Sequence, residues 1–526
     1  MNRPKAKTNA FLERYSAFLP VAVLAPAMTL RLVEYVHCKA VWLDEAYLSL
    51  SILSRGYGGL LDALDYGQGA PLAFLWAVRF AIDCFGAGEY ALRLVPLAAS
   101  LLSALLFWIL LRRWYAPHDA LAPFLVFALA QPAIRYASEA KQYSTDLVVS
   151  LLLLLVFLPI LDNLLETGYE TPTGRSVSDG FRVGPPLLAA AAGALAIWCA
   201  FPALFILAGF TAILLVRAAA MRRWTETAAL AIVGLVWAAS FAANLQIMLR
   251  HNAGNDVVRS WWTDHFMPMP PNSLAELNWF VQTFFDLFRD PVGLALPGLG
   301  ALAFALGTLA FWRRSRWELV FVLSPLPFAL LASGIRMYPF TQRFMLFALP
   351  SLLIVMGEGL RWLNGLPRAR AIYLAVLSLM LLHPAIDAVK LIVQPNTPQG
   401  IRPAFDLLAK NWREGDQTYL FHWAHGPFLY YEIKTGRVFP DKTIGLSSRA
   451  DWSHYIKELE PLRGHPRLWV VVIHTPPPLV RQDPQFIVTY LDTVGKCLES
   501  HRFEESSVFL YDLSAAPQAS RPDAQT

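Results

Sequence analysis

The stretch TDLVVSLLLLLVFLPILDNL, residues 145–164, is mostly apolar over a length that suits a membrane. A helix that crosses about 30 Å of hydrocarbon needs roughly 20 mostly apolar residues, so this stretch predicts a transmembrane helix. The same length criterion applied along the chain predicts about eleven spans. They lie near 15–36, 90–111, 119–137, 145–164, 186–201, 203–217, 226–249, 291–312, 318–334, 343–361 and 370–391.

The overall composition agrees with this prediction. Of the 526 residues, 56% are hydrophobic and 16% are charged, whereas soluble domains have about 45–50% apolar and about 25% charged residues. Too few charges are present to cover a water-soluble enzyme, and four cysteines exclude a disulfide-rich scaffold. The net charge of +5 arises from short basic clusters between apolar runs, which is a signal of membrane topology and not of a nucleic-acid partner.

Residues 70–86 are apolar but short, and they include Arg79 and Asp83. An unpaired charge at mid-bilayer is costly, so we expect this segment to lie flat at the membrane surface. The basic N-terminal tail and four basic clusters then share the cytoplasmic side, as the positive-inside rule requires. The topology predicts a cytoplasmic N-terminus and an external C-terminus. The four clusters are Arg112–Arg113, Arg217 with Arg222–Arg223, Arg313–Arg316, and Arg361 with Arg368 and Arg370.

Two parts of the chain are predicted to lie outside the membrane. Residues 165–185 are predicted to form a mobile cytoplasmic loop, and 395–400 a hinge. The segment 401–526 mixes helical and strand patterns, which favours a small external α/β domain. We therefore expect a transmembrane domain at 1–394, with its first external loop at 37–89, and an α/β domain at 395–526. Its predicted elements are a helix at 403–412, strands at 417–423, 467–474 and 506–513, and a disordered tail from Ala515.

Asp44 and Glu45 open an amphipathic helix in the first external loop. Acidic residues in a first helical turn are favoured by the helix dipole, and this explanation stays open. A carboxylate at the membrane surface is also what a general base needs to deprotonate an acceptor hydroxyl or amine. Later in the loop, Gln68 lies in a glycine-rich turn before the surface helix.

The junction IRYASEAKQYSTD, residues 134–146, is strongly polar for a segment between two apolar helices. Glu139 paired with Tyr143 or Lys141 is one explanation. The other is an anion site in which Lys141 binds a phosphate. Arg343 precedes another apolar helix and needs a partner, for which a phosphate head group is suited.

The loop at 250–268 adds Trp262 and His265. Paired tryptophans are typical of a membrane interface, and sugar stacking is the alternative. A single histidine with no spaced partner is weak evidence for a metal ligand. Cys38 and Cys84 both lie in the first external loop, but their spacing does not argue for a disulfide.

In this order and on one side of the membrane, these motifs resemble the GT-C membrane glycosyltransferases, and among them the family 39-like group of protein mannosyltransferases and bacterial aminoarabinose transferase. The resemblance covers about residues 1–390. The family's acidic motif matches Asp44–Glu45, and its polar junction matches Ser138–Tyr143, with Lys141 in place of the usual arginine. The arginine before a late helix matches Arg343. Many members carry a charged residue or histidine where this chain has Gln68, which weakens metal binding there.

The resemblance implies an α-helical polytopic membrane protein of the GT-C fold that transfers a sugar from a polyprenyl-phosphate donor to a lipid, cell-wall glycan or protein acceptor. It implies Asp44 as general base, with Glu45 beside it, and an inverted anomeric centre. No cofactor is firmly implied, and a divalent metal stays open. The expected location is a bacterial inner membrane with a periplasmic active site. The candidate residues for donor and acceptor are Gln68, Glu139, Lys141, Tyr143, Arg343, Arg336, Tyr338, Trp262 and His265.

Other classes of protein remain as alternatives. A lipid-linked glycan transporter also needs cations for phosphate, but transporters place polar residues near the bilayer midplane, and here they lie at one rim. An O-antigen ligase or polymerase uses a diphosphate-linked donor. For a non-enzymatic scaffold, the charged rim has no purpose.

Overall fold

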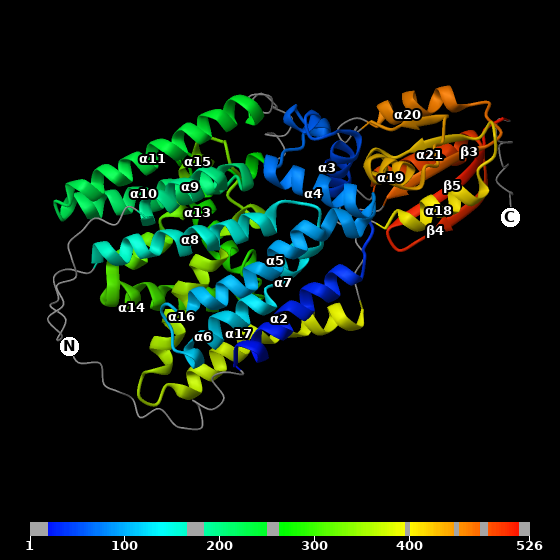
Figure 1. Ribbon diagram of the computed structural model, residues 1–526. Coiled ribbons are helices and arrows are strands. Elements are labelled where there is room, and N and C mark those ends of the chain that lie inside the picture. The colour runs from blue at the N-terminus through cyan, green and yellow to red at the C-terminus, as the bar shows by residue number, and fades with distance from the viewer. Residues whose placement is uncertain are drawn as a thin grey trace.

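The computed structural model has a large bundle of helices and a smaller part with a β-sheet attached at one end (Figure 1). It describes residues 19–165, 184–249, 262–394, 400–446, 452–473 and 482–514. Most of the predicted loop at 165–185, all of the predicted hinge except Gly400, and the tail from Ala515 lie outside these ranges.

The helices that form from the apolar stretches lie close to the predicted spans. They are α2 (Leu19–Val36), α5 (Glu89–Leu111), α6 (Pro117–Leu129), α7 (Gln131–Arg135), α8 (Tyr143–Leu165), α9 (Gly184–Cys199), α10 (Ala203–Ala220), α11 (Trp224–Asn244), α14 (Pro297–Leu323), α15 (Pro325–Gly334), α16 (Leu349–Asn364) and α17 (Arg370–Val393). Of these, α7 and α15 are short continuations of longer helices. Further short helices and turns lie mainly between these helices. These are α3 (Leu43–Ser54), η1 (Gly59–Leu61), η2 (Asp65–Gly67), α4 (Leu72–Phe85), η3 (Tyr136–Ser138), η4 (Leu245–Leu249), η5 (Thr263–His265), α13 (Leu274–Arg289) and η6 (Gln342–Ala348).

The number of membrane spans is where the structure and the sequence differ. In the described chain, six helices are long and apolar enough to cross a membrane, or up to eight if two bent pairs each count as one span. The pairs bend by 58° after α6 and by 41° between α14 and α15. The backbone also breaks inside α14 at Ser315, where φ is −158° and ψ is 91°. The predicted count of eleven relied on short and broken helices and is not confirmed.

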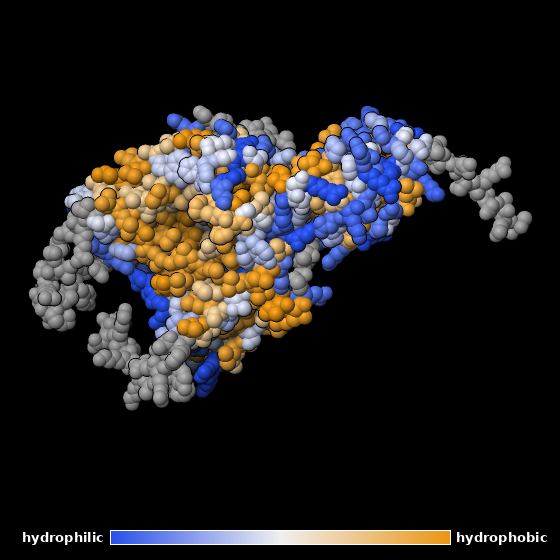
Figure 2. Space-filling view, turned by 45° about the vertical axis from the view of Figure 1, so that its right-hand side comes forward, coloured by the Kyte–Doolittle hydropathy of each residue, from blue (hydrophilic) through white to orange (hydrophobic). Residues whose placement is uncertain are grey.

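The surface of the bundle is that of a membrane-embedded protein. Figure 2 shows a broad hydrophobic surface over the helices, whereas the sheet-containing part is largely hydrophilic. Large apolar side chains such as Leu195, Leu235 and Leu382 project outward from α9, α11 and α17. A contiguous exposed apolar surface of this kind is stable when lipid covers it.

Helix α4 was predicted to lie along the membrane surface. Its 14 residues rise only about 21 Å at 1.5 Å per residue, which is short of the hydrocarbon thickness. The Arg79 guanidinium pairs with Asp83 at 2.6 Å and donates to the Ile52 and Leu53 carbonyls. Both charges are therefore paired, and the surface orientation of α4 stays a prediction.

Helices α14 and α16 pack with their backbones in close contact because glycines face each other. A Cβ on Gly307 would overlap the Val355 carbonyl oxygen, and one on Gly359 would overlap the Ala303 carbonyl oxygen. Small residues at such crossings let membrane helices approach closely. This contact fixes α16, and the segment that precedes α16 carries Arg343.

Residues 400–514 contain a five-stranded mixed sheet in the order β2-β1-β3-β5-β4. The pairs β1–β2 and β1–β3 are parallel, and β3–β5 and β4–β5 are antiparallel. The three predicted strands and the predicted helix are all present. The elements are α18 (Arg402–Asn411), β1 (Gln417–Leu420), α19 (His422–Thr435), β2 (Lys442–Ile444), α20 (Ser453–Leu459), η7 (Glu460–Leu462), β3 (Leu468–Ile473), α21 (Gln482–Val494), β4 (Lys496–Arg502) and β5 (Ser506–Asp512).

A buried carboxylate attaches this part to the bundle. Glu89, at the start of α5, accepts hydrogen bonds from Arg402 at 2.8 Å and from the Tyr431 hydroxyl at 3.0 Å, and it pairs with Lys434. Nearby, Gly426 of α19 lies directly against the Tyr47 ring of α3. The sheet-containing part is therefore held beside the helix that carries Asp44 and Glu45.

Replacing Glu89 with alanine is expected to loosen this attachment. The carboxylate is buried, but Arg402 and Lys434 are each about one third exposed, so solvent screening keeps the expected loss to about 1–2 kcal/mol. Amide hydrogen exchange in α18 and α19 should then become about tenfold faster. Glu460→Ala is the control, because Glu460 forms an exposed ion pair with Arg463. Equal hydrogen exchange in the two variants would contradict the role of Glu89 in attaching this part to the bundle.

Candidate active site

Asp44 lies in the first turn of α3 and forms an ion pair with an arginine distant in the sequence. Its Oδ2 accepts a hydrogen bond from Arg343 Nη2 at 2.8 Å. The two residues are separated by 299 positions, and η6 brings the arginine to the start of α3. Both side chains are only partly exposed, so the pair lies at the edge of the protein interior.

Aromatic rings surround the Arg343 guanidinium. Its Cζ lies 5.3 Å from the Trp262 ring centre, 5.5 Å from that of Trp42 and 5.7 Å from that of Tyr143. Rings at this distance stabilise the cation and exclude water. Its Nε is buried and has no hydrogen-bond partner among the described residues. An unsatisfied charged donor is costly in a protein interior, and an anionic ligand would satisfy it.

Lys141 is a second buried cation next to the same carboxylate. Only 5% of the residue is exposed, and its Nζ donates to Gln68 Oε1 at 2.6 Å. Burial lowers the pKa of Lys141 to about 8, the Asp44 carboxylate opposes this shift, and the Arg343 charge adds to it. An ammonium has three donors, so Lys141 can bind a further acceptor while it keeps Gln68.

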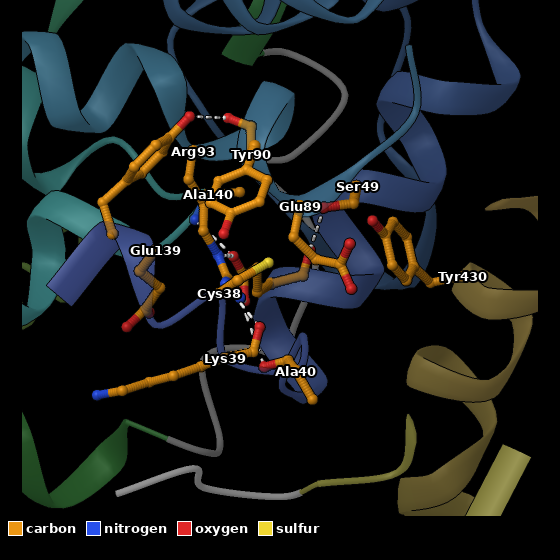
Figure 3. Close-up of polar contacts among 12 residues, drawn as sticks. Cys38, Lys39, Ala40, Ser49, Glu89, Tyr90, Arg93, Glu139, Ala140 and Tyr430 are labelled. Carbon is orange, nitrogen blue, oxygen red and sulfur yellow. Dashed lines mark hydrogen bonds and ion pairs between the residues drawn. The ribbon is translucent and has the colours of Figure 1, made fainter. Parts of the chain in front are cut away.

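Glu45 follows Asp44 but lies in a different environment. Its two carboxylate oxygens each accept a hydrogen bond of 2.6 Å from Arg93, and Oε1 also accepts from the Ala140 amide at 2.9 Å. Arg93 further donates to the Lys39 and Ala40 carbonyls (Figure 3). Both members of the pair are almost completely buried. Glu45 thus joins α3, α5 and the segment that carries Lys141.

Glu139 and Tyr143 flank Lys141 in the polar junction. Glu139 Oε2 lies 3.5 Å from Arg135 Nε. Among the described residues, Glu139 therefore pairs within the junction, but with Arg135 and not with Lys141 or Tyr143, the two partners that the first explanation named. Burial raises the pKa of Glu139, and the Arg135 charge partly offsets that rise. The Tyr143 ring packs against Tyr136 and Phe344, with ring centres 5.0 and 6.0 Å apart. The same ring lies against the Arg343 guanidinium.

A cavity of about 290 Å³ is lined by polar, charged and aromatic side chains of the 264–290 region and by residues 340–342, which directly precede Arg343 in the chain. His265 lines it and lies 5.6 Å from Trp262. Asp290 also lines it, and burial raises the pKa of its carboxyl to about 6 against the opposing charges of Arg135 and Arg343. The cavity offers hydrogen-bonding groups for a polar substrate, and it reaches the segment of Arg343 through Gln342, although neither Asp44 nor Arg343 lines it.

Two of the candidate residues lie apart from this site. Arg336 is exposed after α15. Tyr338 is buried, and its hydroxyl donates to the Phe344 carbonyl at 2.7 Å. Tyr338 therefore supports the segment of Arg343 from within the core.

The described part of the chain contains neither a cluster of metal ligands nor a disulfide. No group of three or more histidine, cysteine, aspartate or glutamate side chains is arranged to hold a metal ion there. Cys38 and Cys84 are both free. The contacts around Arg343 bring together the Asp44 carboxylate and two cations, Arg343 and Lys141.

Sequence reasoning missed two residues that shape the site. Arg93 was counted inside an apolar span, although a charge within a membrane helix is itself a signal of function or pairing. Trp42 directly precedes the acidic pair, and its ring lies 5.5 Å from the Arg343 guanidinium and 5.9 Å from that of Arg135. No sequence pattern connects Trp42 with residues so distant in the chain.

The overall architecture is similar to that of two solved structures. The chain resembles ArnT from Cupriavidus metallidurans in two crystal structures, each covering 95% of this chain and 99% of that one at 14% sequence identity. The TM-score is 0.55 for ArnT bound to undecaprenyl phosphate and 0.52 for its apo state. No family model and no curated protein matches the sequence. At this identity the likeness shows the fold alone.

Proposed function

We propose that the chain is a membrane glycosyltransferase that moves a sugar from a polyprenyl-phosphate-linked donor to an acceptor at the external membrane face. The observation that carries the proposal is the contact of Asp44 with Arg343, with buried Lys141 acting electrostatically on both. One carboxylate and two cations with uncommitted donors suit a reaction that removes a proton and releases a phosphate. ArnT, which shares the fold, has been crystallised with undecaprenyl phosphate.

The reaction follows from the charges of these three residues. An acceptor oxygen or nitrogen attacks the anomeric carbon and forms the new glycosidic bond, and its proton passes to Asp44. The bond between that carbon and the phosphate oxygen breaks, and its electron pair leaves with the polyprenyl phosphate. Lys141 and Arg343 stabilise the negative charge that grows on this leaving group. A single displacement of this kind inverts the anomeric centre.

The ion pair between Asp44 and Arg343 gives donor binding a further role. When Arg343 turns its donors toward the donor phosphate, Asp44 is released for the acceptor proton. Glu45 is a positioning residue in this scheme, because both of its oxygens are occupied by Arg93 and by the Ala140 amide.

The finer expectations from the sequence belong to the same proposal. They are membership of the family 39-like branch, a bacterial inner membrane, and a periplasmic face for the site and for residues 395–526. The hydrophilic surface of the sheet-containing part and its contact with α3 suit a role in docking the acceptor. The acceptor classes are lipid A or core lipopolysaccharide, a cell-wall glycan, and protein.

The direct test uses purified protein in nanodiscs with a polyprenyl-phosphate monosaccharide that carries separate labels on the sugar and the phosphate, together with an envelope extract as acceptor. We expect free polyprenyl phosphate and labelled acceptor to appear together. Passage of intact donor across the membrane would instead identify a transporter. Reaction only with a diphosphate-linked oligosaccharide would identify a ligase or polymerase.

The charge of Lys141 predicts the pH dependence of the reaction. The ammonium is present below its pKa of about 8, so donor capture weakens as the pH rises through that value, and kcat/KM for the donor should fall. The donor phosphate is a diester and does not titrate in this range. Lys141→Arg keeps its charge and should move the alkaline fall upward by at least about one pH unit.

Lys39→Arg is the matched control, because the Lys39 ammonium pairs with Glu34 at 2.6 Å. The backbone carbonyl of Lys39, which accepts from Arg93, is unchanged by the substitution. The pH profile of Lys39→Arg should equal that of the unaltered protein. The same alkaline fall in Lys141→Arg as in the unaltered protein would contradict a role for the Lys141 charge.

A further inference from the structure

A second charged cavity lies at the end of the bundle away from Asp44. It has a volume of about 610 Å³, and its lining includes Arg313 and Arg314 of α14 and Arg361 of α16. Arg343 precedes α16 and Arg361 lies near its end, with 16 residues in the helix. At 1.5 Å per residue, the rise from the start of the helix at Leu349 to Arg361 separates the two places by about 18 Å. The cavity is therefore distinct from the proposed active site.

The charges around this cavity are unequal. Glu358 is buried, accepts from Arg361 at 2.5 Å and forms an ion pair with Arg314 at 3.2 Å. Outside the lining, Glu318 also lies 4.0 Å from Arg314. Asp119 is the other carboxylate in the lining. Three guanidiniums thus face two carboxylates. Within the described ranges, Arg313 takes part in no hydrogen bond or ion pair, so one cation remains available to an anion.

The surroundings of the cavity are those of a membrane interface. Trp362 lines it and is 37% exposed, and Trp312, next to Arg313, is 54% exposed. Exposed tryptophans mark the level of the lipid head groups. A free anion in water does not need an apolar wall, whereas the glycerol region of a lipid would cover the Trp362 ring.

We propose that this cavity binds a phosphate-bearing anion, and that in the membrane its occupant is the head group of an anionic phospholipid. Arg313 supplies the uncompensated charge, Arg314 and Arg361 shape the pocket through Glu358, and Trp362 contacts the lipid below its phosphate. Basic pockets between membrane helices are known to hold such head groups. The basic clusters of the sequence predict that this rim is cytoplasmic, so the lipid would come from the inner leaflet.

The test compares full-length protein, Arg313→Ala and Arg316→Ala by native mass spectrometry after equilibration with phosphatidylglycerol or phosphatidylcholine. Arg316 is an exposed neighbour outside the cavity lining and serves as the matched control. We expect phosphatidylglycerol to be retained in preference to phosphatidylcholine. Its affinity should fall about fivefold in Arg313→Ala, more in Arg313→Glu, and remain unchanged in Arg316→Ala. Neither arginine belongs to the proposed active site, so glycosyl transfer without added lipid should not change.

Each other outcome overturns part of the proposal. Equal losses in Arg313→Ala and Arg316→Ala would show general attraction to a basic surface and no site. Equal retention of phosphatidylglycerol and phosphatidylcholine would also exclude a site for an anionic lipid. A third arm adds inorganic phosphate alone. In this arm the melting temperature of each protein is measured with phosphate and with phosphatidylglycerol. If phosphate stabilises the unaltered protein as much as phosphatidylglycerol does, and does not stabilise Arg313→Ala, the site takes a soluble anion and the lipid assignment is wrong.

Discussion

Replacing Asp44 with asparagine is expected to lower the rate of glycosyl transfer by about 10²–10⁴-fold, the range that general-base catalysis contributes. Asparagine has nearly the same shape and can still accept a hydrogen bond from Arg343 through its Oδ1, so the fold should persist. Binding of polyprenyl phosphate should be retained, because the two cations are unchanged. The measurements are the initial rate of transfer and the melting temperature with and without polyprenyl phosphate.

The control for this prediction is Asp62→Asn. Asp62 is an exposed carboxylate in the same external loop, and its loss should leave the rate unchanged. Retention of most activity in Asp44→Asn would exclude the aspartate as the base. A loss of both activity and polyprenyl phosphate binding would point to a role in donor binding alone.

Replacing Glu45 with alanine is expected to destabilise the protein by about 3–5 kcal/mol, since it leaves the buried Arg93 guanidinium without its partner. The change also removes the acceptor of the Ala140 amide, next to Lys141. The expected result is a marked fall in melting temperature and in the folded fraction recovered in detergent. The double variant Glu45→Leu with Arg93→Met removes both charges and should recover much of that stability.

Glu45→Gln separates positioning from catalysis. The amide keeps the shape of the side chain and one oxygen, so the protein should fold and transfer should fall about tenfold, far less than in Asp44→Asn. A loss as large as that of Asp44→Asn in a protein that still binds polyprenyl phosphate would make Glu45 the base.

Much of the bundle could be predicted from the sequence, because a membrane span needs only length and apolar composition. Residues 145–164 illustrate this, as α8 is Tyr143–Leu165. The count of spans was less secure, since breaks such as that at Ser315 depend on local backbone geometry. Strand β4 was missed because its residues are almost all exposed, and an edge strand without apolar alternation resembles a loop.

The candidate site could be predicted in part. Asp44, Lys141 and Arg343 stood out as charges beside apolar helices, and the topology put them on one side of the membrane. That Asp44 and Arg343 form a direct pair depends on how α3 and η6 pack, which no local pattern records. The same is true of Glu45, whose partner Arg93 lies 48 residues away.

The most direct test of the account is a cryo-electron microscopy map of the protein with undecaprenyl phosphate. We predict phosphate density within hydrogen-bond distance of Arg343 and of Lys141 Nζ, with Asp44 facing the side on which a sugar would be attached. Phosphate density held by other residues, with the Asp44–Arg343 pair and the Lys141–Gln68 hydrogen bond unchanged, would contradict the proposed glycosyl transfer.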